Sequence, residues 1–254
     1  MALPAAAGRR GRDTVVRARA VTGAWEAWAQ ALGRVLDALD WRALGDVYFH
    51  EDGEKLLRNR REPVERLGAL WARALLRRLP AAGRSLHVGA GLAELPAMLA
   101  EVLVAGRTVR AVNLRGEECA ILDRALQQAG LSDRLRIEHM DAGGVDPGTT
   151  YDHLGVVSLF TDPETWPTLS DISYGRICPV QVDVDAFVRE REHARSIASR
   201  LWGLLQRPGW VTTSADELGW FLDQAEAHGV PIEADDALVE TAMVGDPIGF
   251  VRVG

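Results

Sequence analysis

The chain has 254 residues, 47% hydrophobic and 26% charged, which is the composition of a globular protein with a sizeable core. Its net charge of -7 gives no general positive field, so we expect neither nucleic acid nor a membrane as partner. No apolar run approaches the ~20 residues of a membrane-spanning helix, and Cys119 and Cys178 form no zinc or disulfide pattern. We therefore expect a soluble, cytoplasmic protein without a metal site.

The N-terminal third is predicted to be helical. Residues 1–21 are rich in arginine, which we interpret as a flexible tail, with a targeting or polyanion-binding arm as the alternative. Apolar residues at helical spacing then predict one helix from Thr22 to Leu39 and a second from about Glu54 to Leu79. The turn-rich stretch DWRALGDVYFHEDGEK would link them. Residues 1–80 are thus predicted to form an N-terminal helical extension.

Beyond Pro80 the pattern changes to alternating strands and helices. Apolar strands are predicted at 85–88, 108–114, 135–140, 153–160, 209–214, 237–244 and 248–253, and helices at 92–104, 117–129, 186–205 and 216–228. This alternation is typical of a mostly parallel sheet with helices on both faces, and the last two strands form an antiparallel hairpin. Residues 81–254 are therefore predicted to form one α/β domain.

The first predicted strand ends in a glycine turn, VGAGLAE, where ligands of such sheets bind. A phosphate loop of the Walker type is excluded because no GK[ST] follows. In a dinucleotide-binding turn, GxGxxG, a third glycine would stand where this chain has Glu94. Its carboxylate would repel a pyrophosphate. A nicotinamide or flavin oxidoreductase is therefore a weaker alternative.

The order of several stretches resembles class I SAM-dependent methyltransferases over roughly the C-terminal two-thirds of the chain. These stretches are LHVGAGLAEL, VRAVNLRGEECAILDRALQQAGLSDRLRIEHMDA, YDHLGVVSLF, QRPGWVTTS and EAHGVPIEA. The resemblance implies a seven-stranded Rossmann-like sheet, mostly parallel with an antiparallel last strand. It also implies S-adenosylmethionine as cofactor and methyl transfer, which we expect to act on a small molecule.

The same resemblance implies a set of cofactor-binding residues, namely His87, Gly89, Ala90, Gly91, Asn113, Leu114, Asp141, Ala142 and Phe160. Asn113 would bond to the ribose hydroxyls, Asp141 and Ala142 to the adenine, and Leu114 and Phe160 would give apolar cover. The family usually carries acids at the positions of His87 and Asn113. These departures keep open a non-catalytic binding or scaffold protein with a weakened site, and a transfer of the aminopropyl group is a further alternative.

No catalytic residue can be nominated, because methyl transfer depends mostly on positioning the acceptor and removing water from it. The stretch SLFTDPETWP lacks the [DN]PP[YF] pattern of enzymes that methylate nucleobase or glutamine amines. Asp162, His153 and Glu164 are candidates by position only. The long segment from Pro163 to Val182 would cover a substrate, pack as an ordered loop or form a homo-oligomer contact. Within it, Cys178 lacks the partners of a catalytic nucleophile.

Overall fold

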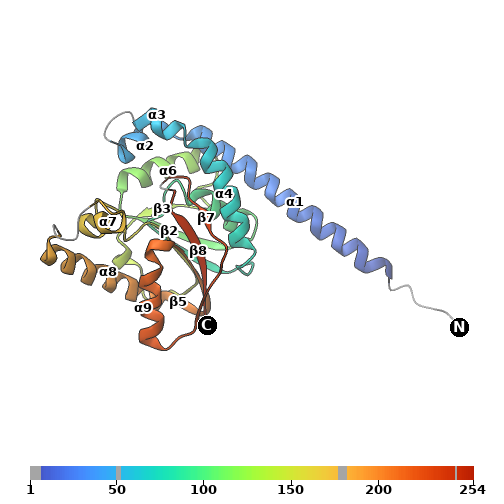
Figure 1. Cartoon of the computed structure of the whole chain (residues 1–254). Coiled ribbons are helices and arrows are strands. Elements are labelled where there is room, and N and C mark those ends of the chain that lie inside the picture. Colours follow the sequence, from blue (N-terminus) through green and yellow to red (C-terminus); the bar gives the residue numbers. More distant parts are fainter. Residues whose placement is uncertain (1–6, 50–52, 177–181, 244) are drawn as a thin grey trace.

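The computed structural model describes residues 7–49, 53–176, 182–243 and 245–254, and Cys178 lies outside them. Figure 1 shows a central sheet with helices on both faces and one long helix, α1 (Ala7–Ala38), extending from the body. α1 begins well before Thr22, so the described part of the predicted tail is helical.

Three more helices precede the sheet: α2 (Trp41–Tyr48), α3 (Gly53–Arg58) and α4 (Arg61–Leu76). α2 lies within the stretch that we predicted as a turn-rich link. Asp40 is its N-cap, and a side-chain oxygen of Asp40 accepts from the backbone N–H of Ala43 at 3.0 Å. The predicted link therefore contains a capped helix.

The sheet has the order β3-β2-β1-β4-β5-β8-β6, with β7 paired to β8. Its strands are β1 (Arg84–Val88), β2 (Thr108–Asn113), β3 (Ile137–His139), β4 (Tyr151–Val156), β5 (Leu205–Ser214), β6 (Ile232–Ala234), β7 (Val239–Glu240) and β8 (Pro247–Val253). β1 to β5 pair in parallel, and β8 runs antiparallel between β5 and β6. The predicted sheet, mostly parallel with an antiparallel last strand, is confirmed. β6 lies between the predicted helix at 216–228 and the predicted strand at 237–244, where we predicted no strand.

The remaining helices are α5 (Leu95–Leu103), α6 (Gly116–Gln128), α7 (Pro167–Ser173), α8 (Val184–Leu204) and α9 (Leu218–His228). One core lies between the sheet and α1, α2, α4, α5 and α6, and a second core includes α8 and α9 on the opposite face. Side chains alternate along a strand, so Leu86 and Val88 of β1 enter the second core while Ser85 and His87 face α5.

The N-terminal helices pack directly on the α/β part. The indole Nε1 of Trp28 in α1 donates to the carbonyl of Pro96 in α5 at 2.9 Å, and both groups are buried. Gly68 of α4 lets that helix approach the same proline, whose ring a Cβ at 68 would strike. The N-terminal helices and the α/β part therefore both contribute side chains to the first of these two cores.

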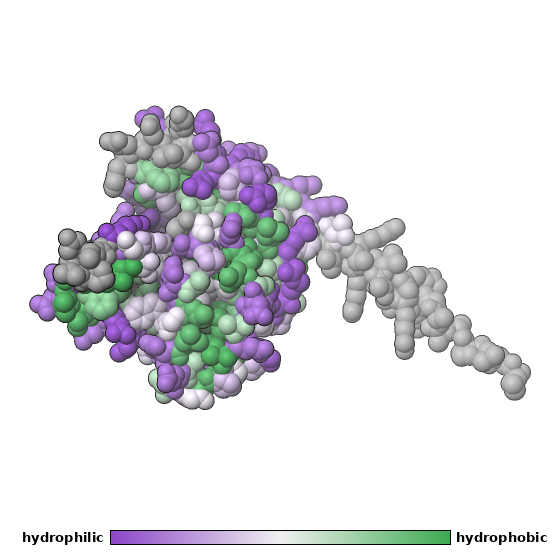
Figure 2. Space-filling model, viewed as in Figure 1, coloured by the Kyte–Doolittle hydropathy of each residue, from purple (hydrophilic) through white to green (hydrophobic). Residues whose placement is uncertain are grey.

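The face drawn in Figure 2 carries hydrophobic areas set among hydrophilic residues. Within the described residues, no helix is both long and apolar enough to cross a membrane.

Candidate functional site

A cavity of about 870 Å³ opens where the carboxyl ends of β1, β2 and β4 meet. The chain leaves β1 toward β2 and β3 on one side, while β4 and β5 lie on the other, so the strand order reverses here. Ligands of open parallel sheets bind at such a reversal. Of the predicted cofactor-binding residues, the cavity wall contains Gly89, Gly91, Asn113, Leu114, Asp141 and Ala142.

The carboxyl group of Glu94 forms a hydrogen bond inside the glycine turn. Its Oε2 accepts from the backbone N–H of Gly91 at 2.8 Å, and burial raises the pKa of Glu94 to about 7. Gly89 supplies the left-handed backbone, φ 71°, from which the turn leaves β1. The N–H that a phosphate would use at this turn is therefore bonded to a carboxyl group of the same chain.

The missing side chain of Gly91 makes room for two groups from other helices. A Cβ at this position would collide with Oε1 of Glu118 from α6 and lie 2.9 Å from the hydroxyl oxygen of Tyr48 from α2. Gly91 lines the cavity, and a larger residue at this position would displace the Tyr48–Glu118 pair.

Glu118 is the centre of a buried hydrogen-bond network on the cavity wall. It accepts from the Tyr48 hydroxyl and, through Oε2, from Nδ2 of Asn113 at 3.0 Å. Burial, reinforced by the charge of Glu118, raises the pKa of Tyr48 well above its usual value, so the phenol keeps its proton and donates. Burial also raises the pKa of Glu118, although Tyr48 and Arg115 oppose the shift.

Asn113 at the end of β2 has its polar atoms engaged within the protein. Besides Glu118, its Nδ2 donates to the carbonyl of Ala90 at 3.0 Å, and its Oδ1 accepts from the backbone N–H of Arg115 at 2.9 Å. Its side chain thus joins the glycine turn, the β2 turn and α6. Asn113 therefore holds the carboxylate of Glu118 in position through this hydrogen bond.

Leu114 and Asp141 lie on the cavity wall at the ends of neighbouring strands. Leu114 is 51% exposed and offers an apolar side chain to the cavity. Asp141 follows β3, and its Oδ1 accepts from the N–H of Gly143 at 2.6 Å, which fixes the carboxylate. An exposed apolar side chain and a fixed carboxylate thus stand on the same cavity wall.

Three of the predicted residues do not line the cavity. His87 is 1% exposed and bonds to Glu101 of α5 at 2.6 Å. Ala90 is fully buried, and Phe160 packs between Trp166 and Trp220. The structure thus places these three side chains against other parts of the protein and outside the cavity wall.

Arg115 bridges the cavity from the turn after β2 to the loop after β4. Its Nη2 lies 3.0 Å from Oδ2 of Asp162, and its Nε lies 3.3 Å from Oε2 of Glu164. Because β1 lies between β2 and β4, this bridge passes over the glycine turn. Asp162 and Glu164 thus serve to hold Arg115, a role that position alone did not predict.

The turn after β4 is held in an unusual backbone conformation. Ser158 has φ 53°, and its hydroxyl donates to Asp246 at 3.2 Å, as the Tyr174 hydroxyl does at 2.9 Å. Glu217 accepts from the N–H of Phe160, and burial raises the pKa of Glu217 to about 8. Strained residues of this kind cluster at functional sites.

Sequence reasoning missed Tyr48, Arg115 and Glu118. Glu118 carries a signal in the sequence, since it stands in the first turn of the helix that follows Asn113. Tyr48 carries none, because its contact joins residues 70 positions apart.

Known proteins resemble this chain in structure only. No family model matches the sequence, and no curated protein matches it. Similar solved structures include a precorrin-6y C5,15-methyltransferase from Geobacter metallireducens, at 13% identity and TM-score 0.48, covering 75% of this chain and 88% of the other.

A second structure is a ribosomal protein L11 methylase from Lactobacillus delbrueckii subsp. bulgaricus, at 16% identity and TM-score 0.43, covering 73% of this chain and 75% of the other. A third is a SAM-dependent O-methyltransferase from Thermotoga maritima, at 15% identity and TM-score 0.43, covering 73% of this chain and 63% of the other. Parallel strands in the order β3-β2-β1-β4-β5 make this a Rossmann-like α/β sheet.

Proposed function

We propose that this chain binds S-adenosylmethionine in the cavity and transfers its methyl group to a small molecule. The observation that carries the proposal is the bond from the Gly91 N–H to Glu94 at 2.8 Å. An acid at this turn disfavours a phosphate-bearing cofactor and favours a ligand with positive charge and no phosphate. S-adenosylmethionine has a sulfonium and an ammonium group and carries no phosphate.

The other parts of the cofactor find matching groups on the wall. Asp141 would accept from the adenine amino group, the backbone of Ala142 would donate to the ring, and Leu114 would cover its face. We assign the ribose hydroxyls to Glu118, which is held in place by Asn113. A carboxylate accepts two hydroxyls better than the amide of Asn113 does.

When bound, the cofactor supplies a methyl group activated by a positively charged sulfur. The chain contributes position and removal of water, which are the main requirements of such a transfer. Trp166 and Tyr174 lie on the cavity wall beyond the β4 turn, where an acceptor would lie. No side chain is assigned as a base.

The charges of the wall favour a small acceptor over a polyanion. The cavity wall carries two arginines, Arg115 and Arg176, and a larger number of acids, namely Glu94, Glu118, Asp141, Asp162 and Glu164. A phosphodiester chain would meet mostly like charge. A cavity of about 870 Å³ is within the size range of sites for small molecules.

Calorimetric titration with S-adenosylmethionine, S-adenosylhomocysteine and NAD(H) tests the proposal. We expect dissociation constants on the order of micromolar for the two sulfur compounds and no heat with NAD(H). Binding of NAD(H) alone would overturn the proposal in favour of an oxidoreductase.

A second candidate, a non-catalytic binding protein of the same fold, is favoured by one observation. The pair of Tyr48 and Glu118 already fills the space beside Gly91. In that case the titration gives no heat with any of the three compounds.

A further inference from the structure

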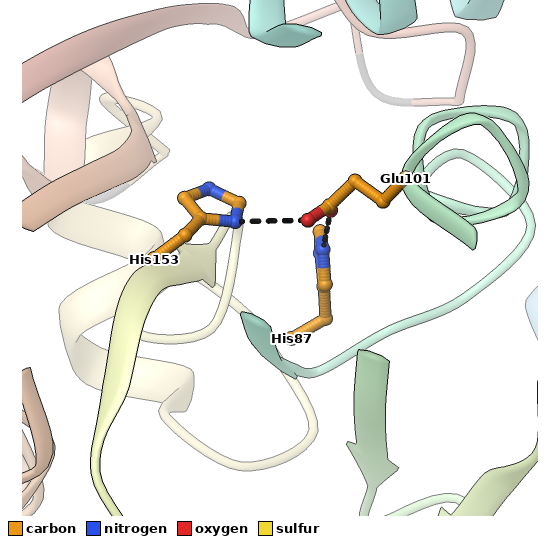
Figure 3. A group of neighbouring side chains, drawn as sticks. All are labelled: His87, Glu101 and His153. Carbon is orange, nitrogen blue, oxygen red and sulfur yellow. Dashed lines mark hydrogen bonds and ion pairs between the residues drawn. The ribbon is translucent and has the colours of Figure 1, made fainter. Parts of the chain in front are cut away.

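A buried polar cluster lies between β1, β4 and α5, outside the cavity lining (Figure 3). The parallel register pairs Ser85 with His153 and His87 with Gly155, so their side-chain positions share one face of the sheet. Glu101 of α5 meets this face. His87, Glu101 and His153 are each at most 1% exposed.

The donor atoms of these three side chains converge. Nε2 of His87 lies 2.6 Å from Oε1 of Glu101, and Nδ1 of His153 lies 3.6 Å from Oε2. One ligand atom from each residue falls within 4.8 Å of the others. Bonds of about 2.0–2.2 Å from a tetrahedral zinc ion would place its ligand atoms roughly 3.3 Å apart. This spacing lies between the two distances from the histidine nitrogens to the Glu101 carboxylate, 2.6 Å and 3.6 Å.

The surrounding groups orient the ligands. Nε2 of His153 lies 2.9 Å from the hydroxyl of Thr212, which leaves Nδ1 directed at Glu101 and without a hydrogen-bond partner. The His87 ring occupies the space that a side chain at Gly155 would fill, since a Cβ there would lie 2.8 Å from its Cε1. The contact of His153 with Thr212 is of the kind that the second ring nitrogen of a metal-bound histidine makes.

The charge of the cluster suits a cation. Arg107 contacts Oε2 of Glu101 at 3.0 Å but also pairs with Asp152, so its own charge is balanced. The cluster itself then offers one carboxylate and two imidazoles, which are ordinary oxygen and nitrogen ligands of zinc.

We propose that His87, Glu101 and His153 bind a zinc ion that fastens β1 and β4 to α5. Two histidines and one glutamate are an established zinc ligand set, with a water molecule as the fourth ligand. Binding would displace the proton between His87 and Glu101 into the solvent. The proposal is independent of methyl transfer.

Metal analysis of the full chain tests this site. Because the ligands are buried, the protein is unfolded in chelator and refolded with zinc or without it, and then desalted. We expect about one zinc per chain, a higher thermal midpoint with zinc, and at least a tenfold loss of bound metal in His153→Asn. The matched control His193→Asn alters an exposed histidine and should keep the metal.

Cobalt(II) gives a second readout on the unmodified chain. Refolding with cobalt should produce the intense visible bands of a tetrahedral ion, which decides the question even where His153→Asn fails to fold. Wild-type protein with less than about a tenth of an equivalent of zinc and no cobalt bands would overturn the proposal. The cluster would then hold a proton in place of the metal.

Discussion

Nδ2 of Asn113 donates to Oε2 of Glu118 over 3.0 Å, so the amide at the end of β2 supports a carboxylate that comes from α6. The cavity wall therefore carries a carboxylate beside Asn113, and it comes from α6, the helix that follows β2. Because Asn113 donates to this carboxylate, we expect a change at either residue to weaken ligand binding.

We expect Glu118→Gln to weaken S-adenosylhomocysteine binding at least tenfold, because the neutral amide loses charge-assisted bonds worth about 1–3 kcal/mol. Calorimetry measures the change, and thermal unfolding verifies that the variant folds. Glu117→Gln alters the exposed neighbouring acid and should bind like the wild type. Equal affinity in both variants would remove Glu118 from the site.

We expect Asn113→Asp to destabilise the fold and weaken binding. The new carboxylate would face Glu118 and the carbonyl of Ala90, each 3.0 Å from the present Nδ2. The lost bonds and added repulsion would cost about 1–3 kcal/mol, measured by urea unfolding at pH 8. Tighter ligand binding in this variant would show that residue 113 contacts the ribose directly.

Asp141→Ala should weaken the adenosyl ligand at least tenfold by removing the acceptor for the adenine amino group. Asp146→Ala is the matched control, since Asp146 also accepts from the N–H two residues ahead but lies outside the cavity wall. Comparison of the two dissociation constants separates lost contact from a lost turn. Similar values would exclude the proposed adenine position.

The free energy of unfolding should decrease as the pH rises from about 4.5 to about 8, because Glu217 keeps its proton in the folded chain. Burial raises the pKa of Glu217 from 4.5 to about 8, so the folded chain holds a proton that the unfolded chain releases across this range. Glu217→Gln keeps an acceptor for the Phe160 N–H and removes the titration. At pH 8 this variant should be more stable by about 1–4 kcal/mol, and near pH 4.5 the difference should vanish.

Urea unfolding at several pH values measures this difference. Glu226→Gln, an exposed substitution on α9, is the control and should keep the wild-type slope with pH. A wild-type slope in Glu217→Gln would show that Glu217 is ionised in the folded chain.

Gly91→Ala should disrupt the site, since its Cβ would strike Glu118 and approach the Tyr48 hydroxyl. We expect a loss of about 1–3 kcal/mol in unfolding free energy together with weaker ligand binding. Gly203→Ala in α8, where a Cβ meets nothing within 4 Å, should instead stabilise by roughly 0.5–1 kcal/mol. Full stability in Gly91→Ala would mean that Tyr48 and Glu118 move apart freely.

The sheet was predictable because its strands are short apolar runs between turn residues, and parallel strands place their carboxyl ends at one edge. Gly89, Leu114 and Asp141 could therefore be placed on the cavity wall. Side-chain direction was harder to predict. His87 faces α5 because strand alternation turns it to the side of Glu101, and the sequence does not say which face the cavity adjoins.

Contacts between distant segments lay beyond the sequence pattern. Arg115 reaches residues 47 and more positions away, and the three proposed metal ligands come from separate elements. Their spacing matches no local motif, so only the register of β1 against β4 brings the two histidines together.

The contact between Tyr48 and Glu118 links the N-terminal helices to the cavity. The sheet and its turns supply most of the cavity wall, whereas α2 adds Tyr48 from outside the sheet. Trp41 and Leu44 of the same helix are buried in the core that also contains α5 and α6. The shape of the cavity is thus set jointly by the sheet and by the docking of α2, and a substitution in this packing layer would reach the cavity through one phenol group.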